Sequence, residues 1–563
     1  MIVLGINDSS HHNTSAAIVR DGELLAAVEE ERLSRIKIDN AYPEQAIQEV
    51  LAIAGLSYAD VDIVALANLA RHEQTPYVDV FYQQVYNLGK HDLAIRKYYW
   101  KHQLDRYLRR LRGRCATRNE VLARQSSYAV EHHLAHAASA YFPSPFAKER
   151  VAVITLDGAG DFSWSSVFLG EYGKLTPIAR YPYINSIGLL YTAITIYLGF
   201  KPSRHEGKVL GLAAYGNPEP LLSRLLANTN QQNWAQLFNA KLARITLEFH
   251  RELGQTVVAE LCKGLSKEDI AAGIQTYTEQ LICQWIQAQV KSLKVSKLAL
   301  AGGVFANVKL NQRILALPEV DNIYVHPNMG DGGLATGAAF EVYARLNTGF
   351  APVFKEQVYL GTDINRNNAL QALQARGIKY LEPQDLASEV AKLLAAGKVV
   401  ARADGKMEYG PRALGNRSVM AAANDKSINQ WLNKKFARTE FMPFAPVILE
   451  SYAHAYFPDW QASHVAAQFM TITYKASALA QQNIPAAVHI DGTARPQVLQ
   501  RARNAKYFDI ISAYQQLTGV PSIINTSFNM HEEPIVRTAD EAISAFISAD
   551  LDALVLGPFL VLR

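Results

Sequence analysis

The chain has 563 residues, of which 49% are hydrophobic and 19% charged, as in an ordinary globular protein with about two to four domains. The formal net charge of +4 is small for this length and does not by itself indicate a nucleic-acid or membrane partner. Three widely spaced cysteines fit neither a disulfide framework nor a CxxC zinc site, which predicts a cytoplasmic protein. No apolar run approaches about 18 residues, so we expect no transmembrane helix and no membrane partner.

The first third of the chain predicts a strand–hairpin–helix–strand unit that then occurs a second time. The strong hairpin signal Asp21-Gly22 lies between two apolar runs of the first unit. The expected elements are strands at 2–6, 15–19, 24–28, 61–67, 151–156, 163–169 and 297–301, and helices at 43–54 and 279–293. Two such copies predict a duplicated α/β fold of the actin, sugar-kinase and Hsp70 class, in which a nucleotide lies between the halves.

A candidate metal site lies between the two units. His132 and His136 are four residues apart in a predicted helix, so both imidazoles share one face. Neutral imidazoles in that arrangement can bind a transition metal. Asp331, just before the small-residue helix 334–340, is the expected third ligand. The alternative is that one histidine caps or packs while the other faces solvent.

Two polar loops follow predicted strands of the second unit. Asp157 and Gly158 begin a predicted turn at 157–161, and Gly302 and Gly303 follow the strand at 297–301. In such loops Asp and Asn side chains and glycine backbone amides can contact phosphates and a metal ion. The alternatives are a plain type I′ turn for the first loop and a kink at a strand end for the second.

Residues 73–124 form an insertion in which basic and aromatic side chains alternate. Over residues 91–118 Asp92 and Asp105 are nearly the only acids. An RNA-contacting surface is one interpretation, and an amphipathic helix with solvated arginines is the other. We expect the insertion and the loop near 185–191 to line a binding pocket.

Turn residues at 346–352 predict the start of a second domain, so the domains are expected at 1–350 and 351–563. Its densest run, residues 405–418, combines glycines with Lys406, Arg412 and Arg417, which suits a phosphate pocket. A second basic group is Lys434, Lys435 and Arg438. Polar loops at 489–495 and 525–529 follow further strands. Four such loops in one domain predict a convergent anion site.

With these motifs assembled, the chain resembles the O-carbamoyltransferase family of nodulation NodU and the enzymes that carbamoylate aminoglycoside, cephem and coumarin antibiotics. The likeness runs nearly end to end. It rests on residues 5–7, 12–17, 29–35, 132–139, 206–216, 410–418, 491–495 and 525–529. The resemblance implies an N-terminal actin/Hsp70-like (ASKHA, Kae1-like) domain and an α+β YrdC/Sua5-like C-terminal domain.

The resemblance also implies a reaction. Carbamoyl phosphate and ATP, the latter with Mg²⁺, would form carbamoyl-adenylate in the C-terminal domain, and the N-terminal cleft would transfer the carbamoyl group to a hydroxyl. His132, His136 and Asp331 would hold Fe²⁺ or another divalent transition metal, and His12 would take the proton of the hydroxyl. Asn13 stands where many relatives carry Asp, and Met442 where some carry Arg.

The loops and the motifs together assign the remaining roles. Catalytic roles in the second domain fall to Lys406 and Arg417. The expected residues for nucleotide and carbamoyl-adenylate are Asn13, Asp157, Gly158, Glu206, Lys208, Gly302, Gly303 and Asn307. The expected residues for carbamoyl phosphate and ATP are Lys406, Arg412, Asn416, Arg417, Lys435, Arg438, Arg495, Asn525, Ser527 and Asn529.

Two other functions fit parts of the same pattern. A tRNA threonylcarbamoyladenosine-type transferase would share the cleft and use the basic insertion, although nucleic acid is the less favoured partner. A non-catalytic actin-like nucleotide switch is the third hypothesis. The acceptor, the metal and the oligomeric state, including a homodimer, stay open at this stage.

Overall fold

The structure, a computed structural model, describes residues 1–8, 13–69, 78–111, 126–436 and 442–563, with the backbone alone for 105–111. The N-terminal half contains two five-stranded sheets with equivalent strand orders, β3-β2-β1-β4-β5 and β8-β7-β6-β9-β10. The strands of the first sheet are β1 (Ile2–Asn7), β2 (Ser15–Arg20), β3 (Glu23–Glu29), β4 (Ile63–Ala67) and β5 (Ser126–Val130). Those of the second are β6 (Val151–Gly160), β7 (Ser163–Glu171), β8 (Lys174–Pro182), β9 (Lys297–Ala301) and β10 (Asn322–Val325).

Strand directions show that the two sheets are copies of one unit. In each sheet two antiparallel pairs, β1/β2 with β2/β3 and β6/β7 with β7/β8, precede two parallel pairs. The parallel pairs are β1/β4 with β4/β5, and β6/β9 with β9/β10. This is the duplicated actin/Hsp70-like fold that the sequence predicts.

Two helices pack against each other between the sheets: α5 (His132–Tyr141) and α13 (Leu334–Leu346). Their backbones approach so closely that a Cβ at Gly337 would lie 1.7 Å from the carbonyl oxygen of Ala135. A Cβ at Gly5, on β1, would lie 1.9 Å from the carbonyl oxygen of Ala335. Small residues at these contacts therefore set the spacing between the helices and the first sheet.

Further helices cover the two sheets. Beside the first sheet lie α1 (Glu31–Ser34) and α2 (Glu44–Ala54). The second unit of the N-terminal half adds α6 (Ile187–Tyr197), α7 (Glu206–Leu212), α8 (Glu219–Leu226), α9 (Ala240–Leu247), α10 (Glu252–Cys262), α11 (Lys267–Leu293) and α12 (Val308–Leu315). The turn predicted at 157–161 is wrong in position. Strand β6 continues to Gly160 and the chain reverses at Asp161 and Phe162, both with positive φ.

The C-terminal half is an α+β unit built on a seven-stranded sheet of order β18-β15-β19-β14-β12-β20-β21. Its strands are β12 (Val400–Ala403), β14 (Arg417–Ala421), β15 (Ala445–Leu449), β18 (Gln497–Leu499), β19 (Ser522–Ser527), β20 (Ala553–Leu556) and β21 (Phe559–Leu562). Two smaller sheets pair β11 (Tyr359–Ile364) with β13 (Gly405–Glu408), and β16 (Tyr474–Lys475) with β17 (Thr493–Ala494). The helices are α14 (Arg366–Ala375), α15 (Leu386–Ala395), α16 (Ser427–Lys435), α17 (Glu450–Tyr456), α18 (Ala478–Asn483), α19 (Ala505–Thr518) and α20 (Ala539–Ala549).

The two halves are joined by polar contacts as well as by apolar packing. Glu532, after β19, accepts from Lys201 at 2.8 Å, Arg204 at 2.9 Å and His205 at 3.1 Å, all in the segment between α6 and α7. Burial would raise the pKa of Glu532, but these three donors lower it to about 2. His205, His531 and Glu532 could in principle hold a metal, but two cations already occupy the carboxylate.

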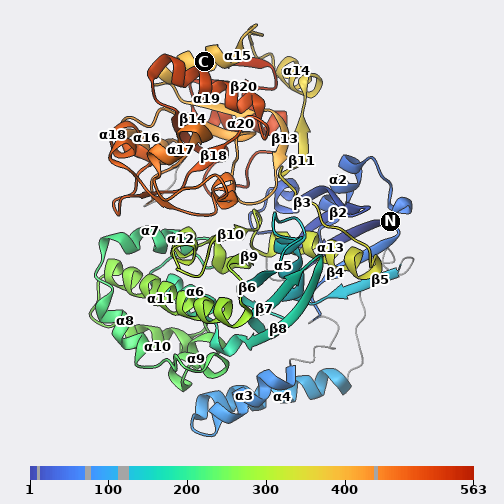
Figure 1. Cartoon of the computed structure of the whole chain (residues 1–563), viewed down its shortest axis with the longest axis vertical. Coiled ribbons are helices and arrows are strands. Elements are labelled where there is room, and N and C mark those ends of the chain that lie inside the picture. The colour runs from blue at the N-terminus through green and yellow to red at the C-terminus, as the bar shows by residue number, and fades with distance from the viewer. Residues whose placement is uncertain (9–12, 70–77, 112–125, 437–441) are drawn as a thin grey trace.

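The described part of the expected insertion, residues 78–111, contains the helices α3 (Val78–Gly89) and α4 (Leu93–Leu111). They pack on each other and stand at the end of the molecule away from the C-terminal half (Figure 1). Among the described helices none combines the length and the apolar character needed to cross a bilayer.

Candidate active site

The parallel strands bring polar side chains from both sheets to one cleft. Asn7 ends β1, Asn68 follows β4 and His132 follows β5, so all three lie at the carboxyl edge of the first sheet. Asp157, on the last part of β6, and Asp331, after β10, lie at the corresponding edge of the second. Such edges are where open α/β sheets bind ligands.

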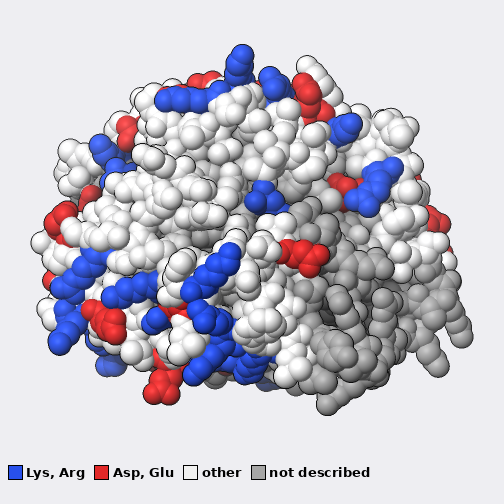
Figure 2. Space-filling model, turned by 90° about the horizontal axis from the view of Figure 1, so that it is seen from below, with Lys and Arg blue, Asp and Glu red and all other residues white. Residues whose placement is uncertain are grey.

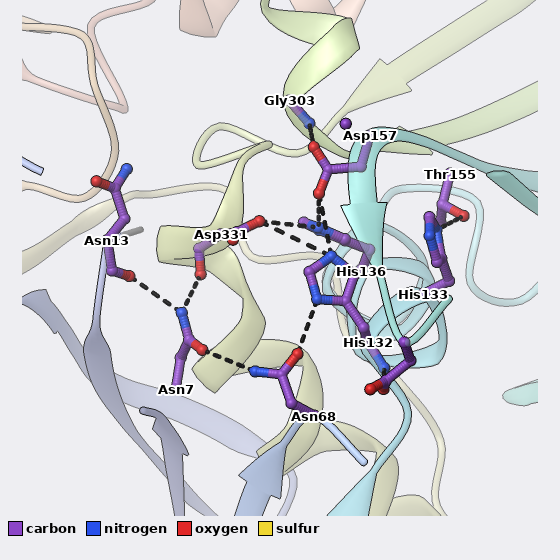
Figure 3. Close-up of polar contacts among 12 residues, drawn as sticks. Asn7, Asn13, Asn68, His132, His133, His136, Thr155, Asp157, Gly303 and Asp331 are labelled. Atoms are coloured by element: carbon purple, nitrogen blue, oxygen red, sulfur yellow. Dashed lines mark hydrogen bonds and ion pairs between the residues drawn. The ribbon is translucent and has the colours of Figure 1, made fainter. Parts of the chain in front are cut away.

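Four side chains in this cleft point toward one another (Figure 3): His132, His136, Asp157 and Asp331. Asp157 Oδ2 lies 3.0 Å from His132 Nε2 and 3.4 Å from His136 Nε2. Asp331 Oδ1 lies 3.5 Å from His136 Nε2 and 3.9 Å from His132 Nε2. One donor atom from each residue falls within 4.8 Å of all the others, so the group can hold a metal ion.

Sequence reasoning found three members of this cluster and gave the fourth, Asp157, a different role. Its other oxygen, Oδ1, accepts from the backbone N–H of Gly303 at 3.1 Å, so the segments after residue 156 and after residue 301 contact each other. The signal that could have placed Asp157 in the cluster is its position at the carboxyl end of a parallel strand beside the one that leads to Gly302.

A chain of side-chain amides fixes the orientation of the His132 ring. The Nδ2 of Asn7 donates to the Asp331 carbonyl at 2.9 Å and to the Asn13 carbonyl at 3.1 Å. The Oδ1 of Asn7 therefore accepts from Asn68 Nδ2, which leaves Asn68 Oδ1 to accept from His132 Nδ1 at 2.9 Å. With the proton on Nδ1, the lone pair of His132 Nε2 faces Asp157, and a proton or a metal cation must lie between them.

His136 supports the same conclusion. It is fully buried, and within the described part of the chain neither ring nitrogen makes a hydrogen bond of good geometry. Its Nε2 faces the Asp157 and Asp331 carboxylates. A buried imidazole without a partner is costly, whereas a divalent cation between it and two carboxylates would satisfy all three groups. The donors thus fit a transition metal.

Proton affinities in the cluster reflect its negative charge. Burial alone would lower the pKa of His132, but the hydrogen bond to Asp157 and the nearby charges of Asp331 and Asp161 raise it to about 9. Burial likewise opposes the raised pKa of His136, which the two carboxylates cause. For Asp157 the two imidazoles outweigh burial and hold its pKa well below the usual range. The site therefore attracts a cation.

Local structure at the start of α5 places the histidines. Glu131 caps the helix by accepting from the N–H groups of His133 and Leu134 at 2.8 Å, and Asp161 accepts from the N–H of His132 at 2.8 Å. Gly160 lies against the imidazole, since a Cβ there would be 2.1 Å from His132 Cδ2. His133 points the other way and bonds to Thr155 at 2.8 Å, so it lies outside the cluster.

The other residues predicted to bind nucleotide line or support the same cleft. Gly302 has φ +105° and lies against the backbone of Leu156, where a side chain would clash. Gly158 accepts from the Ser186 hydroxyl at 2.7 Å. Asn307 caps α12. These three contacts support the local structure, and the nucleotide-binding role of the residues stays a prediction.

Two predicted residues lie on α7, the helix that follows the Glu532 contact. Glu206, its first residue, accepts from the N–H of Ser203 at 2.8 Å and from the Thr192 hydroxyl at 3.1 Å. Lys208, two residues further along α7, is buried. His12, the predicted base, falls outside the described residues.

In the C-terminal half, strand pairing brings the predicted phosphate loops to one edge of the large sheet. The start of β14 pairs with the end of β19 at Ser418 and Ser527, and the end of β12 pairs with β14 at Ala403 and Arg417. The starts of β15 and β18 lie at the same edge. This edge therefore gathers Lys406, Arg412, Asn416, Arg417, Arg495, Asn525, Ser527 and Asn529.

Arg417 has a structural role at this edge. It is fully buried, and its guanidinium donates to backbone carbonyls. The acceptors are the carbonyls of Thr362, Asp404, Gly405, Asn416 and Arg537, at 2.9–3.4 Å. These contacts tie four segments together, so the predicted catalytic role would come in addition to this one.

Several other predicted residues hold the loops in place. Asn416 donates to the carbonyl of Lys406 at 2.7 Å, and Asn525 donates to the carbonyl of Ala413 at 3.1 Å. Asn529 donates to the carbonyl of Glu533 at 2.7 Å. Lys435 pairs with Asp550, and Arg438 falls outside the described residues. The Lys406 side chain is exposed and lines a cavity of about 490 Å³ between the halves.

The basic insertion presents charge and apolar surface together. On α4 the exposed cations Arg96, Lys97 and Lys101 flank the exposed Trp100 and Leu104. Figure 2, viewed from the α3–α4 end, shows lysine and arginine in separate groups among acidic and uncharged described residues. That this region helps to form a pocket for the acceptor stays a prediction.

The fold and the cleft define a two-domain protein of the actin/Hsp70-like class with a candidate metal site and, in its second domain, a basic sheet edge. The family description "Carbamoyltransferase N-terminus" matches residues 2–340, and "Carbamoyltransferase C-terminus" matches residues 391–563. The chain therefore belongs to the carbamoyltransferase family, a family of transferases, which confirms the resemblance drawn from its motifs.

Two nodulation proteins are similar to this chain over most of its length. Nodulation protein NolNO of Sinorhizobium fredii is 34% identical over 99% of this chain and 80% of its own length. Nodulation protein U of Rhizobium tropici is 27% identical over 92% of this chain and 90% of its own. Among solved structures, full-length HypF in its phosphate- and nucleotide-bound form shares 14% identity over 62% of this chain and 56% of that one, with a TM-score of 0.31.

Proposed function

We propose that this chain is an O-carbamoyltransferase that uses carbamoyl phosphate and ATP to carbamoylate a hydroxyl of a small molecule, a natural product or an oligosaccharide. The observation that supports it is the pairing of two different sites within one family member. One is a buried His₂Asp₂ group that attracts a cation, and the other is a sheet edge that gathers basic and amide side chains.

The C-terminal site would make the activated intermediate. Water would cleave carbamoyl phosphate to carbamate and inorganic phosphate. The carbamate oxygen would then attack the α-phosphorus of ATP, which carries Mg²⁺, and the bond to pyrophosphate would break. Lys406 and Arg412 would bind the anionic groups as they enter. Arg417 and Asn416 would hold the loop around them, as their backbone contacts indicate.

The N-terminal site would transfer the carbamoyl group of that intermediate to the acceptor. The acceptor oxygen forms a bond to the carbamoyl carbon, the C–O bond to AMP breaks, and the hydroxyl proton passes to a base, for which His12 remains the candidate. A divalent metal, Fe²⁺ or a related ion held by His132, His136, Asp157 and Asp331, would supply charge stabilisation to the carbonyl or the phosphate.

Carbamoyl-adenylate hydrolyses readily, so water has to be excluded as it moves between sites. The contacts from Glu532 to Lys201 and Arg204 link the loop before α7 to the turn after β19 and would support an enclosed path. Free carbamoyl-adenylate that accumulates in the medium during turnover would argue against such a path.

The test is AMP and pyrophosphate release that depends on carbamoyl phosphate, measured with Lys406→Met. Lys406 is exposed, so its replacement leaves the fold intact, and Lys475→Met, another exposed lysine of the same half, is the matched control. We expect Lys406→Met to lose at least about 100-fold in ATP cleavage while transfer from supplied carbamoyl-adenylate persists. Equal loss of both steps would contradict the two-site mechanism, and steeply salt-dependent tRNA binding would favour a tRNA-modifying enzyme.

A further inference from the structure

Residues 408–410 connect the two candidate sites directly. They begin with the last residue of β13 in the C-terminal half and lie against the loop 327–333 of the N-terminal half, which carries Asp331. Glu408 and Tyr409 are both nearly inaccessible to solvent, at 3% and 4% exposure. Side chains on adjacent residues thus reach into two different sites.

On the C-terminal side, Glu408 organises the basic loop. Its Oε1 accepts from the backbone N–H groups of Leu414 at 2.8 Å, Asn416 at 2.7 Å and Arg417 at 3.0 Å. Three charge-assisted hydrogen bonds to one buried oxygen fix the path of residues 411–417. The loop that carries Arg412 is therefore anchored to Glu408.

On the N-terminal side, Tyr409 supports the Asp331 loop. Its hydroxyl donates to the carbonyl of Gly332 at 2.9 Å and accepts from the Thr336 hydroxyl at 2.8 Å. Gly332 is the residue after Asp331, and Thr336 lies in the first turn of α13. The hydroxyl thus joins the two segments between which the Asp331 carboxylate is presented.

The same loop is held from its other side. Gly410, with φ +111°, packs so closely that a Cβ would lie 2.8 Å from the carbonyl oxygen of Pro327. The Gly410 carbonyl accepts from Arg32 at 3.0 Å, Arg32 pairs with Glu29 at 3.0 Å, and Glu29 accepts from Asn328 at 3.0 Å. These bonds close a ring around the loop, so Tyr409 acts within a rigid frame.

We propose that Tyr409 is a positioning residue for the metal cluster, supplied by the C-terminal domain to hold Asp331 at its place opposite His136. The inference rests on the proposed metal site. A carboxylate ligand acts well only when its backbone is fixed, and partners of ligands commonly contribute 10- to 100-fold to metal affinity. The segment 408–410 would then fix the position of the basic loop 411–417 relative to the metal ligand Asp331.

The test is Co²⁺ affinity of the metal-free full-length protein, measured by titration calorimetry for wild type and Tyr409→Phe. Phenylalanine keeps the ring and removes only the hydroxyl. We expect Co²⁺ to bind about 10-fold more weakly. Tyr456→Phe is the control for loss of a buried tyrosine hydroxyl. The Tyr456 hydroxyl accepts from Asn483 at 2.8 Å and lies on α17 of the C-terminal half, which carries none of the proposed metal ligands.

A second substitution separates positioning from general loosening. Thr336→Val removes the other hydroxyl of the same pair at nearly constant volume. If both act through the Gly332 segment, the double variant should bind Co²⁺ about as weakly as Tyr409→Phe alone, and additive losses would overturn the proposal. ATP cleavage dependent on carbamoyl phosphate should stay within about twofold of wild type in Tyr409→Phe, because Glu408 still anchors the basic loop.

The outcomes are distinct. Wild-type affinity in Tyr409→Phe, or an equal loss in Tyr456→Phe, would overturn the positioning role. A wild-type chain that binds no Co²⁺ would overturn the metal site and, with it, that part of the proposed function.

Discussion

Asp157→Asn is the sharpest perturbation of the candidate cluster. Asparagine has nearly the shape of aspartate and can keep the Oδ1 acceptor for the N–H of Gly303, so the strand end should hold its path. What disappears is a negative charge 3.0 Å from His132 Nε2 and 3.4 Å from His136 Nε2. The substitution therefore isolates the charge from the packing.

The distance gives the size of the effect. At 3.0 Å, a unit charge pair has a Coulomb energy of about 5 kcal/mol at an effective dielectric constant of about 20. Desolvation of the buried carboxylate offsets roughly half of it, which leaves about 2–3 kcal/mol. A cation that feels this charge should bind about 100-fold more weakly to the variant.

Co²⁺ titration of metal-free protein at constant pH measures this change. Asp161→Asn is the control for loss of charge nearby, because the Asp161 carboxylate accepts from the backbone N–H groups of His132 and Leu69. We expect at most a tenfold effect there. Affinity in Asp157→Asn within threefold of wild type, with a large loss in Asp331→Asn, would refute the four-residue cluster.

Three further predictions follow from buried charges. The pKa of His132 is about 9 in the folded protein and about 6.5 in the unfolded chain, which stabilises the metal-free protein by about 3 kcal/mol below pH 6.5. This stabilisation is lost as the pH rises to 9. Urea unfolding of chelator-treated protein between pH 6.5 and 9 measures the loss, and a free energy of unfolding that does not change with pH would contradict the prediction. Arg32→Met leaves the buried charges of Glu29 and Glu31 without their partner and should lower the free energy of unfolding by about 3–5 kcal/mol. Calorimetry should show a smaller loss when the same substitution is made in the Glu29→Gln variant. Arg417→Ala should abolish ATP cleavage together with the cooperative melting of the C-terminal half, and an unchanged melting profile would indicate a purely catalytic arginine.

Much of the N-terminal fold could be predicted from the sequence because its signals are local. The Asp21-Gly22 hairpin, the strand starts and the spacing of His132 and His136 are each set within a few residues. The turn after β6 was placed too early because Gly158 and Gly160 look like turn residues, whereas Gly160 is needed for its contact with His132. In the sequence, a glycine required by contact with a side chain elsewhere in the fold looks the same as a glycine required by a turn.

The C-terminal site shows the limit of such reasoning. Lysines, arginines and glycines in residues 405–418 predict an anion pocket, and strand pairing does bring the loops to one edge. The pattern cannot distinguish an arginine that meets a ligand from one that ties the backbone. The carbonyls that Arg417 binds come from segments as distant as Thr362 and Arg537, and only the folded chain brings them together.

The contact between Ala135 and Gly337 has a consequence for ion selection. Both imidazoles belong to α5, while Asp331 directly precedes α13, so the gap between the helix axes determines how far apart nitrogen and oxygen ligands stand. A methyl group at Gly337 would push the helices apart and widen the coordination sphere. Larger, oxygen-preferring ions would then bind more tightly relative to compact transition metals. Gly337, which contacts no metal ligand, would thus affect which metal the site prefers.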